Sequence, residues 1–481
     1  MVWNEKSDRE DQSIANQLSR RDTLRGGIGF GAMALLGLLS KDQLLYGATR
    51  QPIAPGGTNF APTAKRVVFL FMGGGPSQVD TFDPKPDLSK LHGADVPESI
   101  AKSVPRIKRG GSLRNLMASP FKFDHYGECG TEVSELFPHT AKLVDNLCVI
   151  RSMHHRNPVH GPGECVMLTG TGVGDRPSLG SWISYGLGSE NDNLPWFVVM
   201  NSKTDAMQFA QAPGWEAGFL PPSYQGTVID ANDGIRSISM PPSYDNASRR
   251  RQLDLLNRLN REEFDRLGGI SELDARIRSY ELAFRMQSSA PEIFDLTKET
   301  TETHQLYGTE AKSTSAMGKS CLIARRLIEA GVRFVQIRYG GWDAHNNLQT
   351  NHQTQAEETD RPIAAFLTDL KRRGLLEDTL VIWGGEFGRT PTMEGRKQGR
   401  DHSPSAFSYW LAGGGVKGGQ IIGATDAIGY TPIEQPVRPS DFHATMLHAL
   451  GIDQHELYYH HHGRKELVTV LGGDVVNRVF G

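Results

Sequence analysis

The sequence predicts an α/β fold built on a mostly parallel central sheet. Short apolar runs of strand length recur along the chain without alternating polar residues, which is typical of strands buried on both faces. Segments with helical periodicity lie between several of these runs. Strands that alternate with helices favour a parallel sheet covered by helices.

Six apolar runs are predicted to form strands of this sheet. The first of them ends in the glycine-rich segment 73–75, and polar residues follow most of the others. The predicted strands span residues 66–72, 147–150, 196–200, 332–337, 379–383 and 406–411.

Helices are predicted between the strands and near the C-terminus. Their predicted spans are 320–330, 354–373 and 441–450, and Asp441 is expected to cap the last one. A charged stretch with regularly spaced leucines, residues 249–287, is interrupted by two glycines. This pattern predicts a helical hairpin packed on the main domain.

The composition excludes several classes of protein. The chain has 481 residues with 38% hydrophobic and 22% charged residues, a balance typical of globular proteins and not of disordered or polytopic membrane proteins. Its 52 basic and 55 acidic residues give a formal charge of -3, which offers no argument for a nucleic-acid partner. The 16 histidines are notable because histidine is the commonest metal ligand.

The N-terminus resembles an export signal. Arg20 and Arg21 precede an apolar, glycine-rich run at 26–39, which is shorter than the roughly 20 residues that span a bilayer. We therefore expect a twin-arginine signal peptide at 1–48 and a periplasmic or cell-envelope location; a short buried helix and an uncleaved membrane anchor are the alternatives. A linker at 49–64 would then lead to one large domain, residues 65–481, with a helical insertion at about 245–290.

Polar side chains follow four of the predicted strands at the edge where α/β sheets bind ligands. Because these strand ends converge, we expect the side chains to form one site. The candidates are Ser77 and Asp80, then Arg151, His155 and His160, then Asp343 and His345, and finally Glu386, Arg389 and His402.

The residue types in this set point to a divalent metal. Carboxylates mixed with imidazoles, without thiolates, suit zinc or manganese, with calcium or magnesium as alternatives. The predicted ligands are Asp80, His155, Asp343, His345, Glu386 and His402. Ser77 and Arg151 are expected to bind substrate, and His160, Glu386 and Arg389 to take part in catalysis, with the two arginines able to hold an anion. Glu386 could instead be a surface acid or pair with Arg389.

Other catalytic signatures are absent from the sequence. It contains no Gly-x-Ser-x-Gly elbow and no His-Glu-x-x-His pair. Ser313 stands where a phosphate-binding P-loop would begin with glycine, so no nucleotide cofactor is expected.

Several of these segments resemble a known family. The chain from about residue 65 to the C-terminus is similar to the family called domain of unknown function 1501, a group of exported proteins assigned to the alkaline phosphatase and sulfatase superfamily. The resemblance implies an alkaline phosphatase-like three-layer αβα sandwich with a mostly parallel sheet. It rests on VVFLFMGGGPSQVDTFDPKP (67–86), HGPGECVMLTG (160–170), GGWDAHNNL (340–348), VIWGGEFGRTP (381–391), GRDHSPSAFSYWLAGGGVKGG (399–419) and RPSDFHATMLHALGI (438–452).

The resemblance also assigns positions, with departures. Glu386 and Phe387 stand where the superfamily has an Asp-His metal-ligand pair, so one ligand is kept in kind and one is lost. Asp343 and His345 resemble another ligand pair with closer spacing, and His402 resembles a later histidine ligand. The nucleophile position is His160, and Asp80 is the nearest match for the first-strand carboxylate.

Three hypotheses follow from these observations. The chain is a metal-dependent hydrolase of phosphate or sulfate esters with an atypical nucleophile site, a binding protein for an anion without turnover, or a structural component of the envelope. The expected partner is an anionic small molecule or a sulfated or phosphorylated glycan. The ordinary sulfatase nucleophile is not expected, because His160 replaces it.

Overall fold

An eight-stranded sheet forms the centre of the protein. The computed structural model describes residues 57–105, 112–203, 214–231, 246–266, 271–394 and 398–481, and the predicted signal peptide lies outside these ranges. The sheet order is β12-β4-β11-β8-β1-β7-β5-β6. Its strands are β1 (Arg66–Met72), β4 (Leu147–Met153), β5 (Phe197–Lys203), β6 (Thr227–Ile229), β7 (Phe334–Tyr339), β8 (Thr379–Gly384), β11 (Phe407–Ala412) and β12 (Gln420–Ile422).

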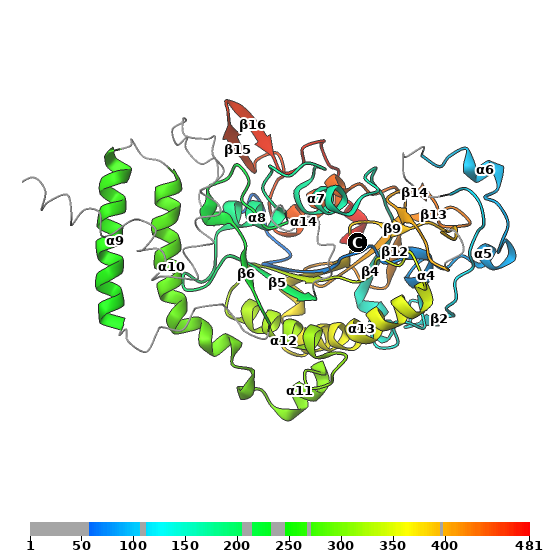
Figure 1. Cartoon of the computed structure of the whole chain (residues 1–481), viewed down its shortest axis with the longest axis horizontal. Coiled ribbons are helices and arrows are strands. Elements are labelled where there is room, and N and C mark those ends of the chain that lie inside the picture. The colour runs from blue at the N-terminus through cyan, green and yellow to red at the C-terminus, as the bar shows by residue number, and fades with distance from the viewer. Residues whose placement is uncertain (1–56, 106–111, 204–213, 232–245, 267–270, 395–397) are drawn as a thin grey trace, which may run out of the picture.

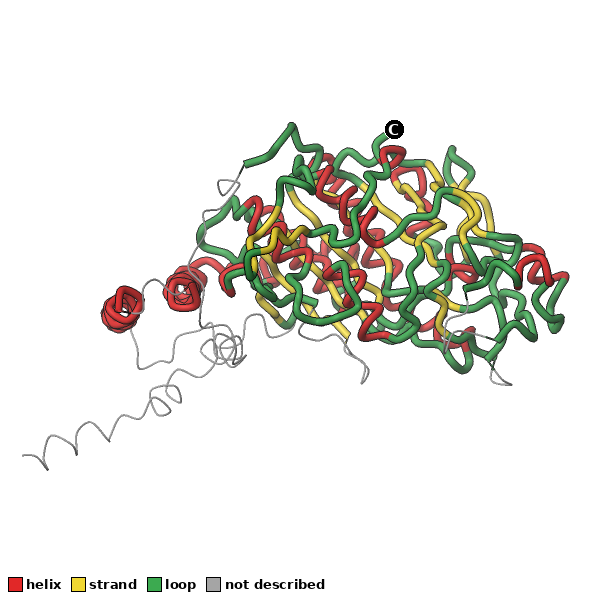
Figure 2. Tube along the Cα trace, turned by 90° about the horizontal axis from the view of Figure 1, so that it is seen from above, coloured by secondary structure: helices red, strands yellow, loops and turns green. Residues whose placement is uncertain are grey.

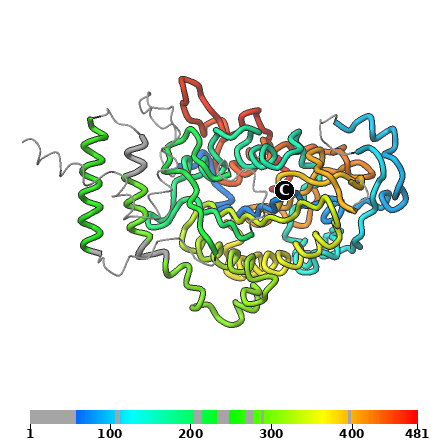
Figure 3. Tube along the Cα trace, viewed as in Figure 1, coloured from blue at the N-terminus to red at the C-terminus, as the bar shows by residue number. Residues whose placement is uncertain are grey.

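The predicted mostly parallel sheet is confirmed. β11 runs antiparallel to both of its neighbours, β4 and β8, and every other pair in the sheet is parallel. β1 lies between β7 and β8, so the start of the domain pairs with segments more than 260 residues later in the chain (Figure 3). All six predicted strands are present, with ends that shift by a few residues.

Helices cover both faces of the sheet and give three layers (Figure 1). The helices α12 (Ser315–Glu329) and α13 (Leu348–Arg372) lie on one face. The other face carries α7 (His160–Thr169), α8 (Leu179–Leu187) and α14 (Pro439–Ala449). The predicted αβα sandwich is therefore confirmed.

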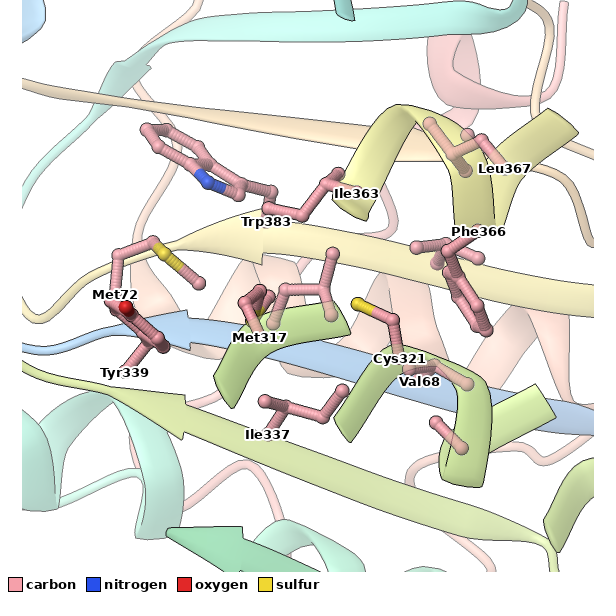
Figure 4. Close-up of a cluster of buried hydrophobic side chains, with 14 of the residues drawn as sticks. Val68, Met72, Met317, Cys321, Ile337, Tyr339, Ile363, Phe366, Leu367 and Trp383 are labelled. Atoms are coloured by element: carbon pink, nitrogen blue, oxygen red, sulfur yellow. The ribbon is translucent and has the colours of Figure 1, made fainter. Parts of the chain in front are cut away.

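The apolar run of β1 is explained by burial on both sides. Val68 packs with α12 and α13 in one hydrophobic cluster, whereas Phe69 packs with α8 and α14 in another. Successive side chains of a strand point to opposite faces, so both faces of a covered strand must be apolar. Figure 4 shows the first cluster, with Cys321 and Phe366 on the helices above Val68 and Ile337 on the sheet.

Two long helices lie where the helical hairpin is predicted. α9 (Asn246–Arg266) packs against α10 (Ser271–Phe294), and both lie beside the main body (Figure 2). The described residues include no helix that is both long enough and apolar enough to cross a membrane.

The start of α14 differs from the prediction. Asp441 was expected as the N-cap, but the helix begins at Pro439 and Arg438 is the capping residue. Proline is well suited to the first helical position because its φ is already helical and it has no N–H to satisfy. Asp441 still serves the helix end, because its carboxylate accepts the backbone N–H of Arg438 at 2.8 Å.

The remaining elements connect these layers. The short helices are α4 (Gln78–Thr81), α5 (Pro86–Lys90), α6 (Glu98–Ala101) and α11 (Thr301–Tyr307). The minor strands form the pairs β2 (Phe123–Tyr126) with β3 (Thr131–Ser134), β9 (Gly388–Arg389) with β10 (His402–Ser403), β13 (Ala424–Thr425) with β14 (Pro432–Glu434), and β15 (Tyr458–His461) with β16 (Arg464–Leu467).

Candidate metal centre

Four side chains converge beyond the carboxyl ends of the central strands. His160 is the first residue of α7, Asp343 and His345 lie in the loop after β7, and His402 begins β10. One donor atom from each of the four lies within 4.8 Å of the others. The expectation that strand-end carboxylates and imidazoles meet thus holds for these four residues.

The spacing of the donor atoms fits one metal ion. Nε2 of His345 lies 3.0 Å from Oδ1 of Asp343 and 2.9 Å from Nε2 of His402. Nε2 of His402 lies 3.2 Å from the same oxygen, and Nε2 of His160 lies 3.3 Å from Oδ2 of Asp343. Ligands bound at roughly 2.0–2.2 Å around a tetrahedral ion stand about 3.3 Å apart. The four side chains therefore need only small shifts to surround an ion.

The far nitrogen of each imidazole is held by an acceptor. Nδ1 of His160 lies 2.5 Å from Oε1 of Glu386, Nδ1 of His402 lies 2.7 Å from the carbonyl oxygen of Pro158, and Nδ1 of His345 bonds the carboxylate of Glu394. When Nδ1–H is donated in this way, the Nε2 lone pair is directed at the centre. This arrangement is typical of histidine ligands in metal sites.

Two glycines allow the loops of the centre to approach each other. Gly399 lies against His345, and a Cβ added there would lie 2.1 Å from the His345 carbonyl carbon and oxygen. Gly74 has a φ of +107°, and its Cβ would lie 2.5 Å from the backbone nitrogen of Asp343. Both positions therefore require glycine, because any side chain would displace a candidate ligand.

Glu386 lies behind His160 and outside the group of four. Its carboxylate is fully buried and also accepts the N–H of Gly74, with Oε1 at 2.9 Å. The ring of Phe387 packs against His160 and His402, with centroids 5.0 and 4.6 Å away. Glu386 is thus placed to orient a ligand rather than to bind the ion directly.

Arg389 is fully buried and its guanidinium nitrogens are engaged within the protein. It donates to the carbonyl oxygens of Gly75 and Arg400, each at 3.1 Å, and to that of Gly74. Its Nη2 also lies 2.5 Å from Oδ1 of Asp343. Arg389 is therefore placed to hold Asp343 and the glycine loop together, and not to clamp a substrate.

The other predicted site residues have partners away from the group of four. The carboxylate of Asp80 pairs with the buried Arg400 at 2.7 Å and accepts a hydrogen bond from Ser77 at 2.5 Å. Nε of Arg151 donates to the carbonyl oxygen of Phe82 at 2.7 Å. Asp80, Ser77 and Arg151 therefore form contacts that hold the fold together, and they lie outside the group of four.

His155 is also used elsewhere. Its Nε2 lies 2.5 Å from the carbonyl oxygen of Glu386, and its Nδ1 accepts the N–H of Asn157 at 3.0 Å. Burial lowers the pKa of His155 to about 4, so the ring stays neutral. His155 supports the backbone beneath the centre and lies outside the group of four.

Sequence reasoning missed Glu394 and Gly399. Glu394 partners His345 and, with Asp401, belongs to a second, more open group of possible donors that shares His345. Neither residue follows a predicted strand, so the strand-end criterion could not find them. Arg400 was missed for the same reason, although it neutralises Asp80 in the interior.

Charges around the centre set the protonation of two of its members. Burial raises the pKa of Asp343, but hydrogen bonds from His160, His345 and His402 together with Arg389 hold that pKa far below its usual value. Burial lowers the pKa of His160, but its contacts with Asp343 and Glu386 outweigh this and raise it to about 9. In the absence of an ion, His160 is therefore protonated at neutral pH.

This protonation predicts pH-dependent metal binding. A metal needs the neutral imidazole, so below pH 9 it must displace a proton from His160. We expect the dissociation constant for Zn²⁺ to fall about tenfold per pH unit from pH 7 to 9, measured by competition with a chromophoric chelator. The free energy of unfolding of the metal-free protein should fall as pH rises. The stabilisation from protonated His160 is fully present below its unfolded pKa of about 6.5 and is lost as pH rises through 9. A pH-independent constant, unchanged in His160→Ala, would contradict this assignment.

Comparison with known families then places the chain. A family profile described as "Protein of unknown function (DUF1501)" matches residues 64–480. The chain belongs to the DUF1501 family. A comparison of this DUF1501 protein with curated proteins gave no match.

Solved structures show distant likenesses to this DUF1501 protein. The phosphonate monoester hydrolase of Silicibacter pomeroyi is 11% identical with a TM-score of 0.36, and the alignment covers 86% of this chain and 76% of that one. Alkaline phosphatase from the Antarctic bacterium TAB5 is 10% identical with a TM-score of 0.34, covering 82% and 99%. Ps i-CgsB in complex with a neocarrahexaose is 11% identical with a TM-score of 0.35, covering 82% and 74%. At this level the likenesses do not indicate an activity.

Proposed function

We propose that the protein is a metal-dependent hydrolase of phosphate or sulfate esters. The observation that supports this proposal is the group formed by His160, Asp343, His345 and His402, in which all three imidazoles direct Nε2 to one carboxylate. Zinc and manganese fit this donor set best, because imidazole nitrogen dominates it.

We assign a different role to each residue of the centre. Asp343, His345 and His402 would hold the ion, which when bound supplies a Lewis acid for an ester oxygen. His160 lies at the positive N-terminal end of α7, where an anionic ester would be favoured. Glu386 orients His160 through Nδ1 and stabilises positive charge on its ring. His160 is therefore placed to serve as the fourth ligand, as a proton donor in its protonated form, or as a nucleophile once it has lost its proton.

The substrate class follows from the same charges. The N-terminus of α7 favours an anion at this end of the centre, and phosphate and sulfate groups are anions of the kind that helix N-termini bind. We therefore propose a small phosphate or sulfate ester, or a glycan that carries such groups, as the substrate.

One experiment on untagged protein tests the metal and the activity together. We expect one Zn²⁺ or Mn²⁺ per chain by elemental analysis, and hydrolysis of an aryl phosphate, a phosphodiester or an aryl sulfate. His345→Ala should lose the ion, and His160→Ala should lower kcat/KM by about 100-fold or more. His460→Ala removes an exposed imidazole outside the group and serves as the matched control. No stoichiometric metal in wild-type protein, even after reloading, would rule out the proposal, and metal with anion binding but no turnover would favour a binding protein.

We also propose that the chain is exported by the twin-arginine route to the periplasm or cell envelope. Arg20 and Arg21 ahead of the short apolar run support this, and a metal centre would fit a route that carries folded proteins. Replacing both arginines with lysine should keep the protein in the cytoplasm when fractions are compared by immunoblotting. Unchanged export of that variant would exclude the twin-arginine route.

A further inference from the structure

A buried ion pair lies one helical turn below the candidate metal centre. Nη2 of Arg338 donates to Oε2 of Glu164 at 2.6 Å, and the two side chains are 3% and 4% exposed. Glu164 follows His160 by four residues in α7, so the two lie on the same side of the helix. Arg338 lies in β7, five residues before Asp343. The pair thus joins the helix that supplies His160 to the strand that leads to Asp343.

Burying two charged side chains costs desolvation free energy, which an apolar contact between the helix and the sheet would not. Burial raises the pKa of Glu164 and Arg338 opposes that rise, so the site disfavours the charge of the carboxylate and the guanidinium compensates it. The rings of Phe71 and Trp215 lie 5.8 and 5.3 Å from the Arg338 guanidinium, so apolar groups lie close to the pair. Replacing such a pair by apolar side chains of similar volume is often neutral or stabilising. Stability alone therefore does not explain two charges at this position.

The geometry of the pair explains them better. An apolar contact lets a helix slide by a fraction of an ångström, whereas a hydrogen-bonded ion pair fixes the distance and direction between its partners. Any shift of α7 along its axis would move Nε2 of His160, which lies 3.3 Å from Oδ2 of Asp343. We propose that the Glu164–Arg338 pair is a positioning device that keeps His160 and Asp343 at the separation one metal ion can bridge. This inference rests on the proposed metal-dependent function.

Two variants of full-length protein separate positioning from stability. Glu164→Gln removes the charge, and the double variant Glu164→Met with Arg338→Met replaces the pair by apolar packing. We expect both to weaken Zn²⁺ binding by about 10–100-fold in chelator competition. The double variant should nevertheless keep a Tm at or above that of wild type, and its Co²⁺ form should show a changed visible absorption spectrum because a ligand has moved. Arg176→Met with Glu466→Met removes another poorly exposed pair and should leave Zn²⁺ affinity unchanged.

The outcomes distinguish this inference from the function on which it rests. Wild-type protein that binds no Zn²⁺ would overturn both. Zn²⁺ binding that is lost in His160→Ala but unchanged in the apolar double variant would overturn only the positioning role. A double variant that binds Zn²⁺ weakly with an undiminished Tm supports the inference, because a merely structural pair would have shown the reverse.

Discussion

Replacing Gly399 with alanine is expected to weaken metal binding by about 100-fold or more. The new Cβ would lie 2.1 Å from the carbonyl carbon and oxygen of His345, so that the loop carrying this ligand must move. Two backbone hydrogen bonds hold the loop in place. The N–H of Arg400 donates to the carbonyl oxygen of Ala344 at 3.0 Å, and the N–H of Leu348 donates to the carbonyl oxygen of Gln398 at 3.0 Å. Displacing an outer partner of a metal ligand already costs 10–100-fold in affinity, and here the ligand itself is displaced. Chelator competition with Zn²⁺ measures the effect.

A second glycine provides the matched control. A Cβ on Gly73 would lie 3.7 Å from the Cα of Gly340, which is ordinary contact, and the backbone of Gly73 is not in the left-handed region. Gly73→Ala should therefore bind Zn²⁺ like wild type. Equal losses in both variants would show that the loops tolerate no change at all, and no loss in Gly399→Ala would show that His345 is not a ligand.

Replacing Arg389 with methionine is expected to destabilise the metal-free protein by about 3–5 kcal/mol. The change removes the guanidinium that contacts Asp343, leaving the protonated His160 as its neighbouring cation, and it removes the donor shared by the carbonyl oxygens of Gly74, Gly75 and Arg400. Buried acceptors that lose their donor, and a buried pair that loses one partner, are the costly part of the change. Urea unfolding in the presence of a chelator measures the free energy of unfolding.

Metal should restore part of this loss. A bound ion neutralises Asp343, so Zn²⁺ should raise the Tm of Arg389→Met more than that of wild type. Arg266→Met removes a mostly exposed guanidinium and should change stability by less than about 0.5 kcal/mol. Equal destabilisation in the two variants, or no added effect of Zn²⁺ in Arg389→Met, would contradict the placement of Arg389 at the centre.

The sheet could be predicted because its signal is local. Each strand must be apolar on both faces, so a run such as 66–72 carries its own prediction without knowledge of its partners. The antiparallel direction of β11 could not be predicted in this way, because it depends on neighbours from distant parts of the chain. The same local reasoning placed the N-cap of α14 at Asp441, whereas the helix begins at Pro439 and its N-cap is Arg438.

The convergence of candidate residues was predictable where it depends on strand ends alone. His160, Asp343, His345 and His402 lie together because the topology of the sheet brings strand ends together. Asp80 meets the same criterion, yet Arg400, 320 residues later, holds its carboxylate. Sequence gives no sign of such long-range pairing. The residues that accept hydrogen bonds from the imidazoles could not be assigned to them from the sequence for the same reason.

The chain separation of the four central residues has a consequence for folding. His345 and His402 are 57 residues apart, and His160 lies 226 residues before Glu386, which orients it. Closing loops of this length costs conformational entropy, which only the assembled sheet and its helices repay. No partly folded segment therefore carries the whole donor set, so capture of the ion should occur only after the domain has closed. Metal occupancy would then report complete folding, and by favouring the native state it would slow the opening of the domain.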